Sequence, residues 1–177
     1  MQITEHFHLM AQYNEWMNTK IYEATRTLPA EELSKNRGAF FGSIMGTLNH
    51  IAVADTIWLK RFTTLLQTHE ELDFIHKQNL PQSLDETLFS NIDELYEYRK
   101  VLDSILSELA KSITAFELNQ TLNYTNTKGI ASNKNLFSLF MHVFNHQTHH
   151  RGQVTTLLSQ AGVDVGVTDL VAIIPND

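Results

Sequence analysis

Four of the nine histidines of the chain lie within nine residues, in the stretch HVFNHQTHH that ends at His150. They are His142, His146, His149 and His150. On a helix that turns about 100° per residue, His146 and His150 lie only about 40° apart, inside a stripe of leucine and valine. His142 and His149 lie about 40° and 60° to the other side of His146, on the shoulder of that stripe. Two imidazoles four residues apart share a helix face and can bind one ion, as in zinc-binding HExxH helices.

This spacing predicts a metal site, because buried imidazoles without partners are costly. The chain has no cysteine, so a histidine site completed by water suits zinc or nickel. A third ligand must come from another helix, and His50 is the leading candidate because it lies on an otherwise apolar helical row. His6 and His8 are weaker candidates near the start of the chain. Three protein ligands and one open position are typical of a catalytic zinc site.

Other interpretations of the histidines remain open or fit less well. The main alternative is a helix surface on which the histidines pair with carboxylates. A di-iron bundle needs two E-x-x-H motifs, and the chain offers one, at Glu5 and His8. A haem held by two histidines explains less of the cluster. The stretch HEELD at 69–73 lacks the second histidine of a zinc-protease motif.

Three polar residues near the candidate ligands have two interpretations each. Asp55 could orient a ligating histidine, or it could form a buried ion pair with Arg151 or Lys60. Arg151 and Gln153 could contact a substrate, or they could only brace the end of their helix.

The bulk properties of the chain limit its class. Its 177 residues are enough to bury a sizeable core, and we expect one domain over residues 1–177. A formal net charge of −7, without a dense Lys/Arg patch, argues against nucleic-acid binding. The N-terminus lacks the features of a signal peptide, and no run of about 18 apolar residues predicts a membrane span. With no cysteine to form disulfides, we expect a soluble cytoplasmic protein.

Four long segments with helical periodicity must position the histidines, and they predict an all-α four-helix bundle. The segments cover about 4–28, about 43–67, a helix expected after NLPQSLDE, and about 135–160. The leucine pattern of the third segment runs from Leu84, inside NLPQSLDE, to Leu109. Ser43 is a plausible cap for the second helix and Gly162 a stop for the fourth. Residues 116–134, rich in Asn and Thr, predict a short irregular hairpin between the third and fourth helices. The apolar tail after Gly162 is expected to pack on the bundle.

Several stretches of the sequence resemble the DinB family, named for damage-inducible bacterial proteins. They are NHQTHHRGQV with TTLLSQAG and TDLVAIIP near the C-terminus, YNEWMNTKIYEATRTLP in the first helix, and RGAFFGSIMGTLNHIAVADTIWLKRF through the second. The likeness covers nearly the whole chain. It implies a bundle with up-down-down-up helix order and a divalent metal, commonly nickel or zinc. Carried over by position, the metal ligands would be His50, His146 and His150.

The resemblance also bears on activity and assembly. Members of the family often form homodimers, and the wider superfamily includes thiol-dependent enzymes, among them a mycothiol-dependent isomerase and bacillithiol S-transferases. The family name records induction by DNA damage and does not imply DNA binding.

Two functions follow as expectations. The first is a metal-dependent enzyme, an S-transferase or a hydrolase, in which the metal activates a thiol cosubstrate or water against a small electrophilic molecule. Any thiol must arrive with a cosubstrate, whose carboxylates Arg151 or the Asn/Thr-rich hairpin could bind. The alternative is a non-catalytic metal- or ligand-binding stress-response protein, with His142, His149 or a carboxylate as a fourth ligand.

Overall fold

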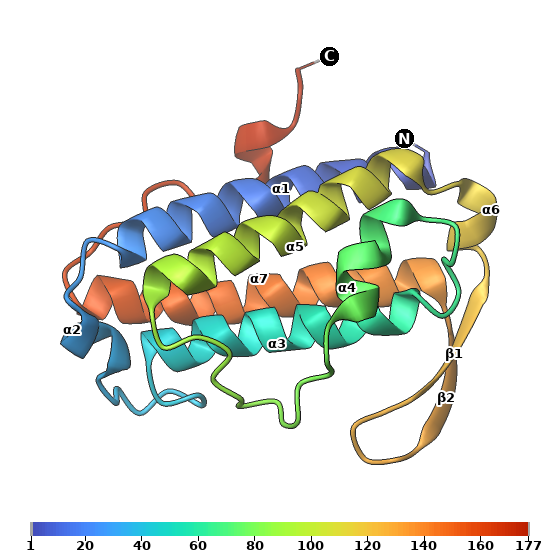
Figure 1. Cartoon of the computed structure of the whole chain (residues 1–177). Helices are drawn as coiled ribbons and strands as arrows, with labels where there is room; N and C mark the ends of the chain where they lie inside the picture. Colours follow the sequence, from blue (N-terminus) through green and yellow to red (C-terminus); the bar gives the residue numbers. More distant parts are fainter. Residues whose placement is uncertain (1, 177) are drawn as a thin grey trace.

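The computed structural model describes residues 2–176, in which four long helices pack side by side (Figure 1). They are α1 (Ile3–Thr25), α3 (Ile44–Phe62), α5 (Ile92–Ser112) and α7 (Leu136–Gln160). In Figure 1, α1 and α7 run in one direction, while α3 and α5 run in the other. This up-down-down-up order confirms the predicted four-helix bundle. Helix α1 packs mainly on α5 and α7, and α3 packs mainly on α7.

Short elements connect the long helices. In chain order they are α2 (Ala30–Ser34), the 3-10 helix η1 (Glu70–Leu72), α4 (Asp73–Lys77), α6 (Ala115–Leu118), β1 (Thr121–Thr125), β2 (Ala131–Asn135) and the 3-10 helix η2 (Leu170–Ile173). Strands β1 and β2 form an antiparallel hairpin in which Thr121 pairs with Asn135. The hairpin lies between the third and fourth long helices, as predicted, and it projects from one end of the bundle (Figure 1).

Polar side chains set the first turns of three long helices. The Ser43 hydroxyl accepts a hydrogen bond from the backbone N–H of Gly46 at 3.0 Å. Asn91 caps α5 in the same way, and Asn135 caps α7. Such caps satisfy backbone N–H groups that have no partner within the helix.

The third helix begins later than its leucine pattern indicates. Leu84 and Leu88 precede the helix, which starts at Ile92 because Asn91 caps the N–H groups of Asp93 and Glu94. The first and second long helices also end a few residues early, at Thr25 and Phe62. The loop that holds Leu84 is thereby free to lie against α3, where it contributes to the histidine cluster described below.

The centre of the bundle contains a buried ion-pair cluster. The Arg99 side chain of α5 is fully buried and contacts Asp55 of α3 at 2.5 Å and Asp103 at 3.0 Å. The amide of Gln147 also donates to Asp55, at 2.6 Å. The predicted buried ion pair of Asp55 therefore forms, but its partner is Arg99 instead of Arg151 or Lys60, and Asp55 does not orient a histidine of the cluster.

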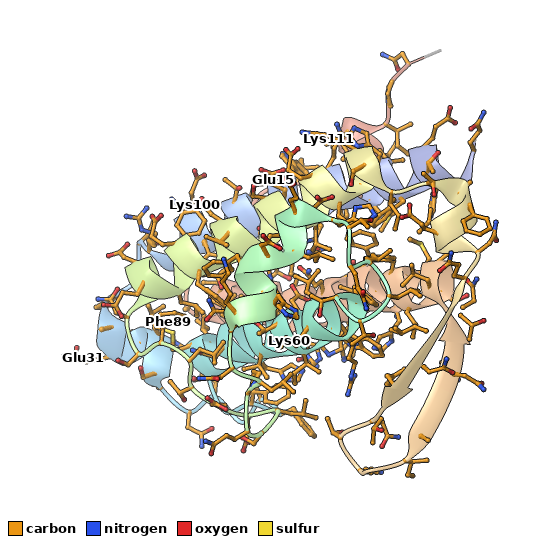
Figure 2. All side chains as sticks on the ribbon, turned by 45° about the vertical axis from the view of Figure 1, so that its right-hand side comes forward. Glu15, Glu31, Lys60, Phe89, Lys100 and Lys111 are labelled. Atoms are coloured by element: carbon orange, nitrogen blue, oxygen red, sulfur yellow. The ribbon has the colours of Figure 1, made fainter. Side chains whose placement is uncertain are left out.

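Arg151 and Lys60 have other partners. Arg151 of α7 is buried and donates to the side-chain oxygens of Asn14 and Gln147. Lys60 lies on α3 close to α4 (Figure 2) and donates to backbone carbonyls at the end of that helix, among them that of Gln78 at 2.8 Å. Both cations are thus used to hold helices together.

The tail after α7 returns along α1. The Tyr13 hydroxyl donates to the carbonyl of Thr168 at 2.6 Å, and Lys20 donates to that of Val167. Leu170 and Ile173 pack against the core, as expected for an apolar tail. Charged side chains such as Glu15, Lys100 and Lys111 cover the outer faces of α1 and α5 (Figure 2). Within residues 2–176, no helix combines the length and apolarity that crossing a lipid bilayer requires.

Candidate metal centre

Three histidines meet between α3 and α7. His50 comes from α3, and His146 and His150 come from successive turns of α7, which runs antiparallel to α3 (Figure 1). One ring nitrogen from each residue lies within 4.8 Å of the other two. The structure therefore brings together the same three residues that the sequence predicted as ligands.

A backbone carbonyl fixes the orientation of the His50 ring. Its Nδ1 atom lies 2.7 Å from the carbonyl oxygen of Leu84. Because a carbonyl can only accept, Nδ1 carries the proton, and the lone pair of Nε2 points toward His146. A ligating histidine held in this way has one tautomer and one ring position.

Gln153 fixes the His150 ring in a similar manner. The Nδ1 atom of His150 donates to Oε1 of Gln153 at 2.9 Å. The amide nitrogen of Gln153 in turn donates to Nε2 of His149 at 3.2 Å. Gln153 therefore braces the candidate ligand rather than the helix end, and it connects His149 to the cluster without making it a member.

The donor set fits one divalent ion. The Nε2 atoms of His50 and His146 are 3.2 Å apart. Two nitrogen ligands of a tetrahedral zinc ion, each at about 2.0–2.1 Å, are separated by about 3.3 Å. An all-nitrogen donor set suits zinc and nickel and does not suit calcium or magnesium, which prefer oxygen.

The environment keeps these rings neutral. Burial, together with the neighbouring His150 and His50, lowers the pKa of His146 to about 3. Burial also lowers the pKa of His50 and of His150, although their hydrogen bonds to Leu84 and Gln153 act in the opposite direction. Metal binding requires neutral imidazole, so near pH 7 no proton has to leave the site before an ion can bind.

The other predicted histidines lie outside this cluster. His6 of α1 contacts Phe137, and neither it nor His8 joins the group of three. His142 packs edge-on against Trp58, with ring centroids 5.2 Å apart. It lies one turn before His146 and faces a cavity rather than the centre of the cluster.

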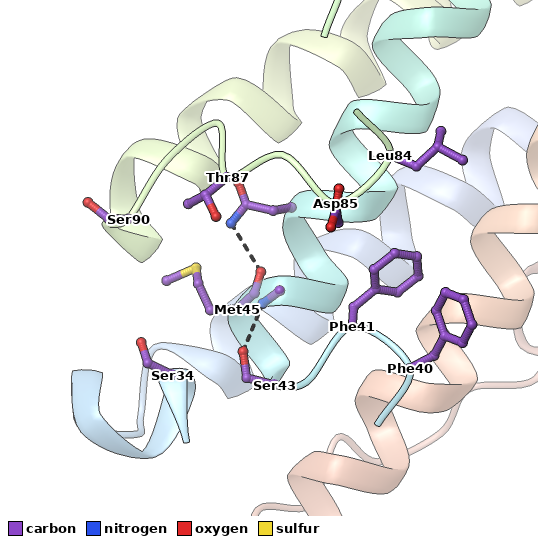
Figure 3. Close-up of a pocket in the computed structure, with 11 residues that line it drawn as sticks. Ser34, Phe40, Phe41, Ser43, Met45, Leu84, Asp85, Thr87 and Ser90 are labelled. Carbon is purple, nitrogen blue, oxygen red and sulfur yellow. Dashed lines mark hydrogen bonds between the residues drawn. The ribbon is translucent and has the colours of Figure 1, made fainter. Parts of the chain in front are cut away.

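Phe41 covers one side of the cluster. Its ring stacks on that of His50 at 3.7 Å and meets His150 edge-on. Phe41 and Leu84 also line a surface cavity of about 830 Å³ at the start of α3 (Figure 3). The chain passes so close to α3 here that any side chain at Gly46 would overlap the Phe41 carbonyl. The glycine therefore permits the segment that covers His50.

A second cavity opens beside His50 and His146. It has a volume of about 220 Å³. Its lining residues come from α3, the loop at Leu84, the hairpin and α7: they include His50, Ile57, Trp58, Arg61, Tyr124 and His146. A neighbouring cavity of about 590 Å³ shares Ile57, Arg61 and Tyr124 with it. A small molecule could thus reach the histidines from the hairpin side.

The residues around this approach were only partly predicted. The hairpin does line it, through Tyr124 and Asn126. The predicted substrate contact Arg151 lies elsewhere, buried among side chains of α1 and α7. Arg61 lines the cavity instead. Its only sequence signal is its position three residues after Trp58, on the same side of the helix.

The bundle and the histidine cluster define a mostly helical protein with a candidate metal centre. The chain matches the model of the DinB family over residues 1–175 and belongs to that family. This confirms the resemblance that the sequence motifs indicate.

Two relatives illustrate the match. The chain is 29% identical over 162 residues to the protein named Protein DinB of Bacillus subtilis (strain 168), covering 89% of this chain and 87% of that protein. The crystal structure of a DinB-like protein from Bacillus cereus superposes with a TM-score of 0.62 at 23% identity. That superposition covers 92% of this chain and 95% of the other, and it supports the fold.

Proposed function

We propose that His50, His146 and His150 bind one zinc or nickel ion, and that the protein is a metal-dependent enzyme. It would use a thiol cosubstrate or water to attack a small electrophilic molecule. The observation that carries the proposal is that three neutral imidazoles converge, two of them held by orienting hydrogen bonds, and that His50 and His146 line a cavity large enough for a small molecule.

The ligand number favours a catalytic over a structural ion. Three protein ligands leave one position of a tetrahedral zinc ion for a water or a substrate atom. A metal ion bound there would lower the pKa of a coordinated thiol or water and so make it a nucleophile near neutral pH.

The chain's own residues would orient the ligands and shape the approach. Leu84 and Gln153 hold two rings in the tautomer that presents Nε2. Trp58 and Ile57 provide apolar walls that limit water beside the histidines. Since the chain has no cysteine, the sulfur atom of an S-transfer reaction must come from a second substrate.

Metal content of untagged protein, measured by mass spectrometry, is the first test. Wild type is expected to contain about one zinc or nickel ion per chain, and His146→Ala is expected to lose it. His8→Ala, on α1 and outside the cluster, is the matched control and should retain the ion. No metal in wild type after incubation with either ion would refute the site.

The reaction needs a second measurement. Metal-loaded wild type and His146→Ala are mixed with a small thiol and 1-chloro-2,4-dinitrobenzene, and thioether formation is followed by absorbance. A rate that depends on both the metal and His146 supports S-transfer. A bound ion with no exchangeable water, and no activity with a panel of thiols or with water, would instead support the non-catalytic metal-binding role.

A further inference from the structure

Arg61 differs from the other arginines in how its charge is used. Arg26, Arg37 and Arg99 each form an ion pair with a carboxylate. Arg151 is buried among hydrogen-bonding side chains. Arg61 forms none of the ion pairs found within residues 2–176.

Aromatic rings hold the Arg61 guanidinium in place. It lies 4.6 Å from the centre of the Trp58 ring and 4.9 Å from that of Tyr124. One nitrogen, Nη2, donates to the carbonyl of Thr125 at 3.2 Å. A guanidinium has five N–H donors in a rigid plane, so this arrangement orients the group and leaves donors for a ligand.

The position of Arg61 links it to the histidines. Arg61 lies eleven positions after His50 on the same helix, which places the two about 20° apart around the axis and about 16 Å apart along it. An α-helical side chain points back toward the N-terminus of its helix, here toward His50. Both residues accordingly line the 220 Å³ cavity, and Arg61 also lines the adjoining 590 Å³ cavity.

Within residues 2–176, the two cavities contain no carboxylate that could pair with the Arg61 guanidinium. Among the described residues that line them there is no aspartate or glutamate. The other cation there, Lys60, already donates to the carbonyls of Ile75 and Gln78. In a protein with a formal net charge of −7, an uncompensated arginine at the approach to the histidines would attract anions locally.

We propose that Arg61 is the binding site for the anionic end of the substrate, a carboxylate or phosphate on an elongated small molecule whose other end reaches the histidine cluster. The assignment of the second end rests on the proposed metal function, whereas the anion site at Arg61 does not. Arg61 thus replaces Arg151 as the residue that selects an acidic cosubstrate.

The first experiment uses cobalt(II)-loaded protein and two thiols that differ only at the far end. These are 6-mercaptohexanoate and 6-mercaptohexan-1-ol, whose binding is followed by the sulfur-to-cobalt absorption band. Wild type is expected to prefer the carboxylate by about tenfold or more, the effect of a charge-assisted hydrogen bond. Arg61→Gln should lose the preference while binding the alcohol as before. An undiminished preference in Arg61→Gln would overturn the proposal.

Two further variants separate the charge of Arg61 from its part in folding. Arg26→Gln is the matched control, because Arg26 also lies near a tyrosine ring, that of Tyr96, but lines neither cavity. It should keep the wild-type preference. Arg61→Lys keeps the charge but loses the planar fork, and it should retain a reduced preference. If Arg61→Lys behaved like Arg61→Gln and both variants melted below wild type, the role would be structural.

The second experiment uses metal-free protein and distinguishes failure of this inference from failure of the metal function. Hexanoate, hexyl phosphate and hexan-1-ol are titrated by NMR into wild type and Arg61→Gln. Binding of either anion that weakens by about tenfold in Arg61→Gln supports the anion site even if no metal ever binds. The anion that binds more tightly identifies the chemical class of the anionic group on the substrate. Equal binding of the anions by both proteins, or none by wild type, would overturn the site.

Discussion

The Nδ1 atom of His150 donates to Oε1 of Gln153, three residues later on α7, at 2.9 Å. This contact turns the opposite ring nitrogen toward His50 and His146. Both residues belong to α7, so the helix backbone that fixes the position of His150 also fixes the position of Gln153. Removing the Gln153 side chain therefore tests how much this hydrogen bond contributes to metal affinity.

Gln153→Leu should weaken zinc or nickel binding by about tenfold to a hundredfold, the usual effect of removing a partner that orients a ligating histidine. Competition with a chromophoric chelator measures the affinity. Gln153→Glu, which keeps an acceptor for Nδ1–H, should bind at least as tightly as wild type. Equal affinities for Gln153→Leu and wild type would show that packing alone holds the ring.

Gly46→Ala should disturb the cover over His50. The added methyl group would overlap the Phe41 carbonyl, so the segment must move, and we expect a loss of about 1–3 kcal/mol in the free energy of unfolding. Metal affinity should fall as well, because the Phe41 ring stacks on His50. Chemical denaturation and metal titration give the two values.

The matched control for that change is Gly152→Ala on α7. A methyl group there meets no atom within 4 Å, and alanine favours a helix over glycine by about 1 kcal/mol. This variant should be as stable as wild type or more so. A stable, metal-binding Gly46→Ala protein would mean that Phe41 has no part in the centre.

His69 forms a pH-dependent contact remote from the candidate metal centre. Its two ring nitrogens lie 3.0 Å from carboxylate oxygens of Glu71 and Glu117. Burial lowers the pKa of His69, but the hydrogen bonds to Glu117 and Glu71 outweigh it and raise the pKa above the ordinary 6.5. The folded state therefore binds the proton more tightly. The stabilisation is fully present below pH 6.5 and is lost as pH rises through the folded-state pKa.

His69→Gln should accordingly destabilise the protein by about 1 kcal/mol more at pH 6 than at pH 9. Urea denaturation at the two pH values measures the difference. His76→Gln, at an exposed histidine on the nearby α4, controls for the loss of a histidine as such. A pH-independent effect of His69→Gln would show that the ring acts only by packing.

Arg99→Met should cost about 3–5 kcal/mol of unfolding free energy, because it leaves Asp55 and Asp103 buried without their cation. Burial already raises the pKa of Asp103 to about 6, although Arg99 lowers it. Adding Asp55→Asn and Asp103→Asn to the variant should recover part of the loss. Lys100→Met, at the exposed neighbouring position, should change stability by no more than about 0.5 kcal/mol.

The candidate ligands could be predicted because periodicity places side chains on helix faces. His146 and His150 fall on one apolar stripe of α7, and His50 falls on an apolar row of α3, so packing these faces together brings the rings into one place. The bundle and the hairpin followed from the same patterns. That the three histidines bind a metal stays a prediction.

Such patterns could not predict the groups that surround the cluster. The Leu84 carbonyl that orients His50 could belong to any residue, since every residue has one. The partner of Asp55 depends on how α3 and α5 are aligned, and periodicity along one helix does not determine that alignment. The importance of Arg61 depends on where the hairpin lies, which brings Tyr124 to its guanidinium.

The all-histidine composition of the cluster has a consequence for the conditions under which the protein can work. A centre built on thiolates loses its ligands when peroxide oxidises them to sulfenic acid or disulfide. Here the chain contains no cysteine, and the three imidazoles are not substrates for that chemistry. A metal held by them would therefore stay in place during oxidative damage, when the thiols around the protein are being consumed.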